Sequence, residues 1–340
     1  RLWVKRHGNT KALIRVPPSM VLYPIMFEES STVAASNVYA DTAALAQISR
    51  LKRDRRALIL AHTYQLPEVQ AAADLVGDSL ELSRAAARTD ARVIVFCGVR
   101  FMAETAKILA PDRTVLLPAE NAGCPMADSI TAEDLREFKA RYPGRPVVTY
   151  INSTAEVKAE SDWCCTSANA LKVIEAVDAE EILCVPDRNL ARWCQRNTSK
   201  KLIWWDGFCL VHARISAEDA RLAKAKYPDA LLLAHPECEP EVLDRADHVL
   251  STSQMLSFAA RSTARRFLIA TEAEVVWRLR KDHPDREFYT VGAAQHCANM
   301  KKTRLADVVR ALETGNPEIE LDADLMDRAR SPIERMLALP

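Results

Sequence analysis

The 340-residue chain predicts an α/β fold: three pseudo-equivalent three-layer αβα domains with small parallel sheets around a pseudo-threefold axis. Two observations carry this prediction. A Glu-Val pair followed by Asp, six residues after the glutamate, begins at Glu68, Glu156 and Glu241, with separations of 88 and 85 residues. Each copy lies in the same alternation of apolar strand-like runs and helix-like stretches, which is typical of βαβ units with parallel strands.

Three apolar runs in each repeat predict the strands. The first strands are expected at 57–62, 146–150 and 230–235, the second at 93–97, 181–185 and 267–271, and the third at 114–118, 202–205 and 288–291. The similar stretches 130–143 and 215–228 predict helices, with Thr131 and Ser216 as N-caps and acidic residues in the first turn. Ligands bind outside the carboxyl ends of parallel strands, so we expect the site there.

The repeats also set the expected domain organisation. A first repeat over 40–140 is mixed with C-terminal elements, a second covers 141–227, a third covers 228–315, and 316–340 forms a tail that packs back. Residues 1–39 match no repeat and are expected to be an N-terminal extension, without the pattern of a secretory signal.

Charge and composition narrow the class of protein. Lys plus Arg and Asp plus Glu both number 46, so the formal net charge is zero, whereas nucleic-acid and membrane-surface binding demand a basic excess. No run approaches the 18 or more apolar residues of a membrane span. Nine cysteines are too sparse and irregular for a disulfide scaffold. We therefore expect a cytoplasmic protein with no nucleic-acid and no membrane partner.

One cysteine recurs a few residues after each third strand. Cys124, Cys209 and Cys297 are separated by 85 and 88 residues. Three thiolates that arrive from three domains suit a metal ion or a cluster; zinc is one interpretation, although structural zinc sites usually pair their ligands in short loops. A 4Fe–4S cluster usually has four cysteine ligands, and with three it keeps one iron open as a Lewis acid. Cys97, Cys184 and Cys194 have no counterpart and are expected to be buried structural thiols.

Polar residues follow the first strand of each repeat. The strand-like runs end at His62, Tyr150 and His235, and two residues later stand Tyr64, Asn152 and Glu237. A carboxylate directly after a buried strand is costly unless it is functional or paired. Glu237 is therefore the best candidate for a general base, with Tyr64 as the acid. His212, three residues after Cys209, is either a contact to the cluster or substrate or a simple helix-start histidine.

A hydroxyl residue opens a helix five residues after each repeat aspartate. These residues are Ser79, Ser167 and Thr252. The free N–H groups and positive dipole end of a helix N-terminus bind phosphate or carboxylate. Three such positions together predict a substrate with several anionic groups.

The chain resembles the quinolinate synthase family over roughly residues 40–337. The matching stretches, in order, are AHTYQLPEVQ (61–70), GDSLELSR (77–84), FMAETAKIL (101–109), GCPMADSIT (123–131), YINSTAEVKAESDWCCTSANA (150–170), PDRNL (186–190), GFCLVH (207–212), HPEC (235–238), STSQM (251–255) and CANMKK (297–302). So many motifs in one order make the resemblance specific.

The resemblance implies a step of de novo NAD biosynthesis, in which iminoaspartate and dihydroxyacetone phosphate condense to quinolinate, phosphate and water. It implies a 4Fe–4S cluster on Cys124, Cys209 and Cys297, and a handover of iminoaspartate from L-aspartate oxidase. The implied catalytic residues are Glu237, Tyr64, His235, His62 and His212. The implied substrate-binding residues are His62, Ser79, Tyr150, Asn152, Ser167, His235, Glu237, Ser251 and Thr252. An iron–sulfur hydro-lyase on another polyanionic acid and a non-catalytic cluster sensor are the alternatives.

Overall fold

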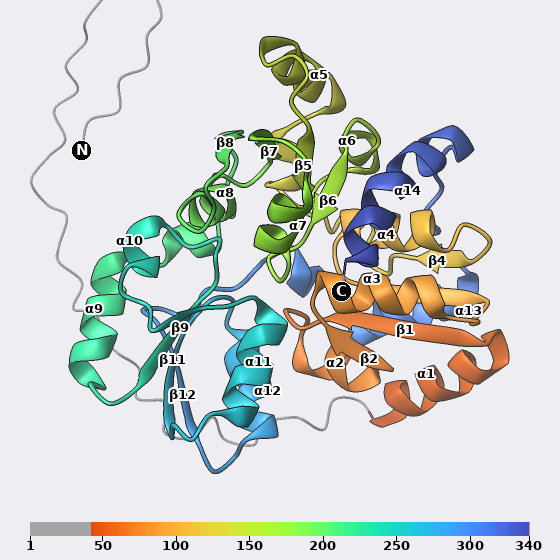
Figure 1. Ribbon diagram of the computed structural model, residues 1–340. Helices are drawn as coiled ribbons and strands as arrows, with labels where there is room; N and C mark the ends of the chain where they lie inside the picture. Colours follow the sequence, from red (N-terminus) through yellow and green to blue (C-terminus); the bar gives the residue numbers. More distant parts are fainter. Residues whose placement is uncertain (1–41, 340) are drawn as a thin grey trace, which may run out of the picture. The chain divides into compact units, whose positions relative to one another are not determined.

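The computed structural model describes residues 42–339 and, over that range, contains three four-stranded parallel sheets that surround a common centre (Figure 1). Helices flank each sheet on both faces. The predicted α/β class with three αβα units is thereby confirmed. The predicted N-terminal extension, 1–39, lies outside the described residues.

Each repeat contributes four strands in the same spatial order. The first sheet has the order β2-β1-β3-β4, the second β6-β5-β7-β8 and the third β10-β9-β11-β12. The strands are β1 (Ala57–His62), β2 (Leu75–Gly77), β3 (Val93–Cys97), β4 (Thr114–Leu116), β5 (Val147–Tyr150), β6 (Trp163–Cys165), β7 (Glu181–Val185), β8 (Lys201–Trp204), β9 (Leu231–Ala234), β10 (His248–Val249), β11 (Arg266–Ala270) and β12 (Glu287–Thr290). The strands expected from the apolar runs are all present, and each sheet has one further short strand, β2, β6 or β10.

The repeat aspartates explain these additional edge strands. Each aspartate immediately precedes an edge strand, and its carboxylate accepts a hydrogen bond from a backbone N–H of the neighbouring first strand. The pairs are Asp74 with Ile59 at 2.8 Å, Asp162 with Val147 at 2.8 Å and Asp247 with Leu232 at 2.7 Å. The same residues also bond through their backbones. The recurring Asp therefore fixes an edge strand to the strand beside it.

The helices connect the strands and follow the cysteine loops. They are α1 (Thr42–Arg55), α2 (Pro67–Ala72), α3 (Ser79–Arg88), α4 (Arg100–Leu109), α5 (Ala132–Arg141), α6 (Ala155–Ala159), α7 (Ala170–Ala176), α8 (Arg188–Gln195), α9 (Ala217–Lys226), α10 (Pro240–Leu243), α11 (Thr252–Arg261), α12 (Glu274–Asp282), α13 (Leu305–Thr314) and α14 (Ala323–Ala338). The predicted N-caps are confirmed, because Thr131 and Ser216 each accept a backbone N–H in a capping box.

The helix after each cysteine loop packs on the sheet of the next repeat. Leu135 and Phe138 of α5 lie in one apolar cluster with Val147 and Leu183 of the second sheet. In the same way α9 covers the third sheet, and α13, with α1, covers the first. Each cysteine loop thus lies at a junction between two units. The domain limits predicted at 140, 227 and 315 remain predictions. Each of these three helices lies mainly in one predicted domain but packs on the sheet of another.

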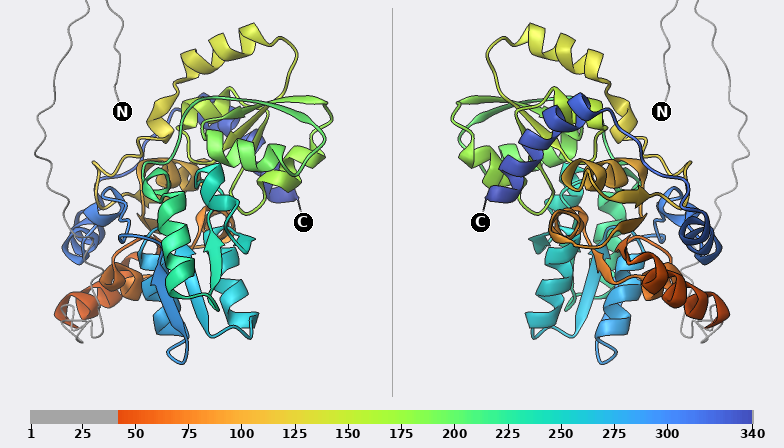
Figure 2. Two further views of the ribbon diagram at one scale, coloured as in Figure 1. Left: turned by 90° about the vertical axis from the view of Figure 1, so that its left-hand side faces the viewer. Right: turned by 90° about the vertical axis from the view of Figure 1, so that its right-hand side faces the viewer.

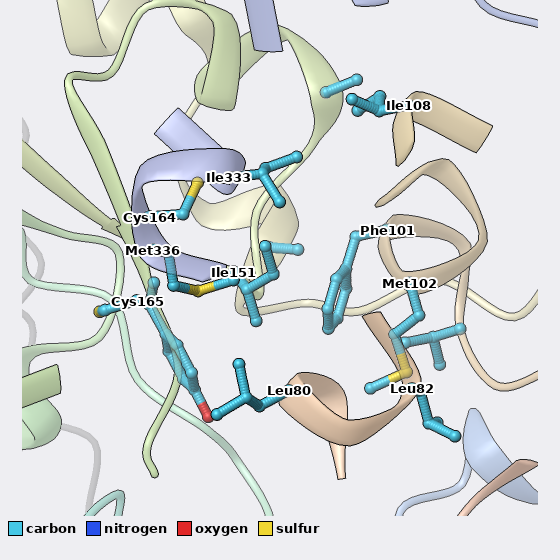
Figure 3. Close-up of a cluster of buried hydrophobic side chains, with 14 of the residues drawn as sticks. Leu80, Leu82, Phe101, Met102, Ile108, Ile151, Cys164, Cys165, Ile333 and Met336 are labelled. Carbon is cyan, nitrogen blue, oxygen red and sulfur yellow. The ribbon is translucent and has the colours of Figure 1, made fainter. Parts of the chain in front are cut away.

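The last helix packs on the second sheet. Helix α14 contacts α6, β6 and α4, and both side views show it beside the second unit (Figure 2). Its Ile333 and Met336 belong to the same apolar cluster as Ile151 and Cys164 (Figure 3). Within residues 42–339, no helix has both the length and the apolar character required to cross a bilayer.

Candidate active site

The carboxyl ends of the three sheets enclose a cavity of about 190 Å³. Twelve of the residues that the sequence pointed to line it: His62, Tyr64, Ser79, Cys124, Tyr150, Asn152, Ser167, Cys209, His235, Glu237, Thr252 and Cys297. The two others lie behind the cavity wall, His212 beside Glu237 and Ser251 as the N-cap of α11. The three repeats therefore share one site.

Two histidines occupy equivalent places at the ends of first strands. The Nδ1 atom of His62 accepts the N–H of Tyr64 at 3.1 Å, and Nδ1 of His235 accepts the N–H of Glu237 at 3.3 Å. This pattern assigns the ring proton to Nε2 in both residues. Burial lowers the pKa of His62 to about 4 and that of His235 to about 3. Both rings are neutral near pH 7 and can donate a hydrogen bond through Nε2.

Glu237 is a buried carboxylate held from two sides. Tyr150 donates to its Oε1 at 2.5 Å, and Nδ1 of His212 lies 2.7 Å from its Oε2. Burial raises the pKa of Glu237, but the adjacent His212 and the hydrogen bond from Tyr150 outweigh burial and hold the pKa well below its usual range. The side chain is therefore an oriented anion at the centre of the site.

Thr271 connects two of the predicted catalytic residues. Its Oγ1 lies 2.9 Å from the hydroxyl of Tyr64 and 2.9 Å from Nε2 of His212. The Tyr64 hydroxyl also lies 3.1 Å from Oγ1 of Thr252. Burial raises the pKa of Tyr64 well above its usual value, with a further contribution from Glu237. A continuous polar chain thus runs from Tyr64 through Thr271 and His212 to Glu237.

The three cavity cysteines differ from the other cysteines in their exposure to solvent. Cys124, Cys209 and Cys297 are partly exposed, whereas the six other cysteines are buried. A short 3₁₀ turn begins three residues after each, as η1 (Ala127–Ser129), η2 (His212–Arg214) and η3 (Met300–Lys302). Burial raises the pKa of all three thiols, to about 12 for Cys124, while backbone N–H groups of these turns act in the opposite direction. Such thiols need a bound cation to be thiolates.

The spacing of the sulfurs bears on what they could hold. Among residues 42–339, Cys209, His212 and Glu237 form a group whose ligand atoms all lie within 4.8 Å of one another, but the three thiols do not form such a group. A single tetrahedral ion with metal–sulfur bonds of about 2.3 Å would bring its sulfurs to within roughly 4 Å. The wider arrangement fits a group of several metal atoms better than one ion.

Further groups around the cavity favour a polar ligand. The Oδ1 atom of Asn152 is buried without a hydrogen-bond partner among the described residues, although it lies in the cavity wall. A buried polar atom without a partner in the protein indicates a site for water or ligand. Arg214, which is exposed, also lines the cavity and adds a cation at its edge.

Sequence reasoning missed Thr271 and Arg214. Thr271 is the last residue of the apolar run at 267–271, where a β-branched residue is explained by strand propensity alone. Its position just past the end of β11 is the signal that could have found it, because that edge holds the site. Arg214 lies in a short turn whose direction the sequence does not reveal.

A buried, multi-domain cavity with a polar chain and three convergent thiols defines an enzyme that acts on small molecules. A family model for "Quinolinate synthetase A protein" matches residues 46–338. A quinolinate synthase of Dehalococcoides mccartyi is 53% identical over 291 residues, which cover 86% of this chain and 96% of that protein. The quinolinate synthase of Methanoregula boonei is 53% identical over 300 residues, covering 88% and 99%, and that of Geotalea uraniireducens is 51% identical over 294 residues, covering 86% and 97%. The chain belongs to the quinolinate synthase family.

Proposed function

We propose that this enzyme condenses iminoaspartate with dihydroxyacetone phosphate to give quinolinate, phosphate and two molecules of water, as a transferase of NAD biosynthesis. The observation that carries the proposal is the meeting of three repeat-equivalent cysteines with Glu237 and its partners in one cavity. The relatives named above, all quinolinate synthases, support it. Both substrates are small polyanions, in keeping with a cavity of about 190 Å³ whose wall includes the polar side chains of Ser79, Asn152 and Thr252.

The donor set fits an iron–sulfur cluster. Cys124, Cys209 and Cys297 would hold a 4Fe–4S cluster, and the turns after them supply N–H groups toward each sulfur, a feature that tunes such clusters. When bound, the cluster would supply a Lewis acid at its fourth iron, which has no cysteine ligand. The six buried cysteines do not enter this role.

The hydroxyl and amide side chains would bind the anionic groups of the substrates. Ser79 and Thr252 are the first residues of α3 and α11, so their hydroxyls lie at helix N-termini. In α3 the Asp78 carboxylate already accepts the N–H groups of Leu80 and Glu81, so Ser79 would bind an anionic group through its side-chain hydroxyl. The N-terminus of α11 would add the positive end of its helix dipole. Ser167 and Asn152 line the same cavity from the second unit. Ser251 caps α11 and so holds Thr252 in place.

The polar chain would carry protons between reacting atoms. Glu237 is the proton acceptor, because its carboxylate is ionised and its direction is fixed by Tyr150 and His212. Tyr64, whose high pKa keeps it protonated, is the donor. His62 and His235 are neutral and would donate hydrogen bonds to substrate oxygens through Nε2.

We further propose that iminoaspartate is supplied in the cytoplasm by oxidation of aspartate, with L-aspartate oxidase as the partner. An imine hydrolyses readily in water, so a buried cavity protects it after transfer. The supply route requires only that an aspartate-oxidising enzyme forms the imine; it does not require a particular binding surface on this protein.

The activity is tested by supplying the anaerobically purified, iron-loaded protein with enzymatically generated iminoaspartate and dihydroxyacetone phosphate. We expect quinolinate and phosphate in equal amounts, measured by chromatography and phosphate assay. Omission of either substrate should abolish both products. An iron-loaded protein that forms no quinolinate would overturn the proposed function.

A further inference from the structure

The strongest unexplained feature outside the reacting groups is a pair of buried carboxylates behind the cysteine loops. Asp187 and Glu272 stand two residues after the ends of β7 and β11. Their spacing of 85 residues is that of the repeat, and the equivalent position in the first repeat, 88 residues before Asp187, is Val99. All three side chains are buried.

The residue that follows each of these positions donates a backbone hydrogen bond to a cysteine loop. The N–H of Arg100 donates to the carbonyl of Ala122 at 2.8 Å, that of Arg188 to Gly207 at 2.8 Å, and that of Ala273 to Gln295 at 2.9 Å. Each acceptor stands two residues before the cysteine of its loop. This hydrogen bond is thus common to all three repeats, and it places the side chain of Val99, Asp187 or Glu272 directly behind the loop.

In the third repeat the carboxylate bonds the cysteine itself. Oε1 of Glu272 accepts the backbone N–H of Cys297 at 3.2 Å and lies 2.6 Å from Nζ of Lys301. Its Oε2 accepts the N–H of Glu274 at 2.9 Å. Lys301 in addition donates to the carbonyl oxygen of Tyr64. The Cys297 loop is therefore fixed to the end of β11 and to the Tyr64 segment of the first unit.

In the second repeat Asp187 holds a similar place. Its Oδ1 accepts the N–H of Leu190 at 2.7 Å and caps α8, while its buried Oδ2 has no hydrogen-bond partner among the described residues. The backbone of Asp187 pairs with Gly207, two residues before Cys209, as an isolated parallel β-bridge. Gly207 allows the close approach of this loop, because a Cβ there would lie 2.6 Å from the carbonyl oxygen of Pro186.

We propose that Asp187 and Glu272 are positioning residues that hold the loops of Cys209 and Cys297 from behind. The cluster then has a carboxylate beside two of its three cysteines and an apolar side chain, Val99, beside the third. This inference rests on the proposed function for the cluster itself. Groups behind metal ligands orient them, and their loss typically costs about 10- to 100-fold in metal affinity.

The test uses the iron-loaded enzyme under anaerobic conditions and two measurements other than activity. These are the rate of iron release to a ferrous chelator and the midpoint reduction potential of the cluster. We expect Glu272→Gln and Asp187→Asn to speed iron release roughly tenfold to hundredfold. Glu272→Gln should raise the potential because a negative charge is lost, and Lys301→Gln should lower it because a positive charge is lost.

The matched control is Glu104→Gln. Glu104 is also a buried carboxylate that accepts a backbone N–H, that of Ala155 at 3.2 Å, but it lies between α4 and α6. It pairs with the side chain of Arg100, whereas the Cys124 loop is held by the backbone N–H of Arg100. Its variant should match the parent in both measurements. Circular dichroism melting checks that each variant is folded, and a folded variant that binds no cluster also supports the proposal.

The inference is overturned if Glu272→Gln and Asp187→Asn release iron as slowly as the parent, or if Glu272→Gln and Lys301→Gln shift the potential in the same direction. If Glu272→Gln or Asp187→Asn does not fold, Lys301→Gln decides, and an unchanged potential in that variant overturns the inference. A parent protein that takes up no cluster refutes the proposed cofactor instead, so the two failures are distinguishable.

Discussion

The hydroxyl of Tyr150 donates a hydrogen bond of 2.5 Å to Oε1 of Glu237, although the two residues come from different sheets. Tyr150 ends β5, and Glu237 follows β9. His212 approaches the other carboxylate oxygen, Oε2, at 2.7 Å. The orientation of the central carboxylate is therefore set by the junction of the second and third units.

The first prediction concerns this hydrogen bond. In Tyr150→Phe, the carboxylate of Glu237 keeps only its contact with His212 and turns more freely. A hydrogen bond to a charged group contributes about 1.5–3 kcal/mol, so kcat should fall roughly 10- to 100-fold. Steady-state kinetics measure the change. Tyr142→Phe, at a partly buried tyrosine that ends α5 and packs beside Phe138, is the control and should retain full activity, because Tyr142 does not line the cavity. An unchanged kcat in Tyr150→Phe would exclude a role for the contact.

The second prediction concerns Thr271. Replacement by valine keeps the shape but removes the hydroxyl between Tyr64 and His212. Because two buried groups lose a partner, the free energy of unfolding should fall by about 1–3 kcal/mol, and kcat should fall as well. Thr303→Val is the matched control, since the buried Oγ1 of Thr303 has no hydrogen-bond partner among the described residues. Chemical denaturation should show the control to be neutral or slightly stabilised; equal losses in both variants would contradict the bridging role.

The third prediction concerns Arg214 at the edge of the cavity. If its charge attracts anionic substrates, Arg214→Gln should lower kcat/KM several-fold at low ionic strength with little change in kcat. Salt screens such attraction, so the difference from the parent should shrink as ionic strength rises. Arg221→Gln, at an exposed residue of α9 that pairs with Glu218, should not change kcat/KM. A difference for Arg214→Gln that does not depend on salt would contradict attraction at a distance.

The fourth prediction concerns the repeat aspartates. Asp162→Ala removes the acceptor for the N–H of Val147 and loosens β6 from β5. The free energy of unfolding should fall by about 1–3 kcal/mol. The exposed Asp178 serves as the control, and its replacement by alanine should change stability by less than about 0.5 kcal/mol. Urea denaturation compares the two variants. Equal stability of the two would contradict a role for the recurring Asp in holding the edge strand.

The sequence predicted most of the fold because its strongest strands are long, apolar and repeated. The runs at 57–62 and 93–97 became β1 and β3 almost unchanged. The edge strands could not be found in this way, because β10 contains only two residues and is held through Asp247. The packing of α5 on the second sheet also has no local signal, since it depends on contacts between distant segments.

The site was predictable where it follows the repeat and obscure where it does not. Cys124, Cys209 and Cys297 fall at one register position, so the repeat alone was enough to place three distant residues together. Thr271 and Arg214 have no such counterpart. The contact of His212 with Glu237 required tertiary structure, because the sequence alone left its direction open.

The most direct test of the account is the iron and sulfide content of the anaerobically reconstituted protein and of single cysteine variants. The parent should bind about four irons and four sulfides per chain. Cys124→Ser, Cys209→Ser and Cys297→Ser should each lose the cluster and its visible absorption. Cys194→Ser, which changes a buried thiol away from the three cavity cysteines, should retain both. A full iron and sulfide content in any of the three cavity variants, or its loss in Cys194→Ser alone, would contradict a cluster held by one cysteine from each repeat.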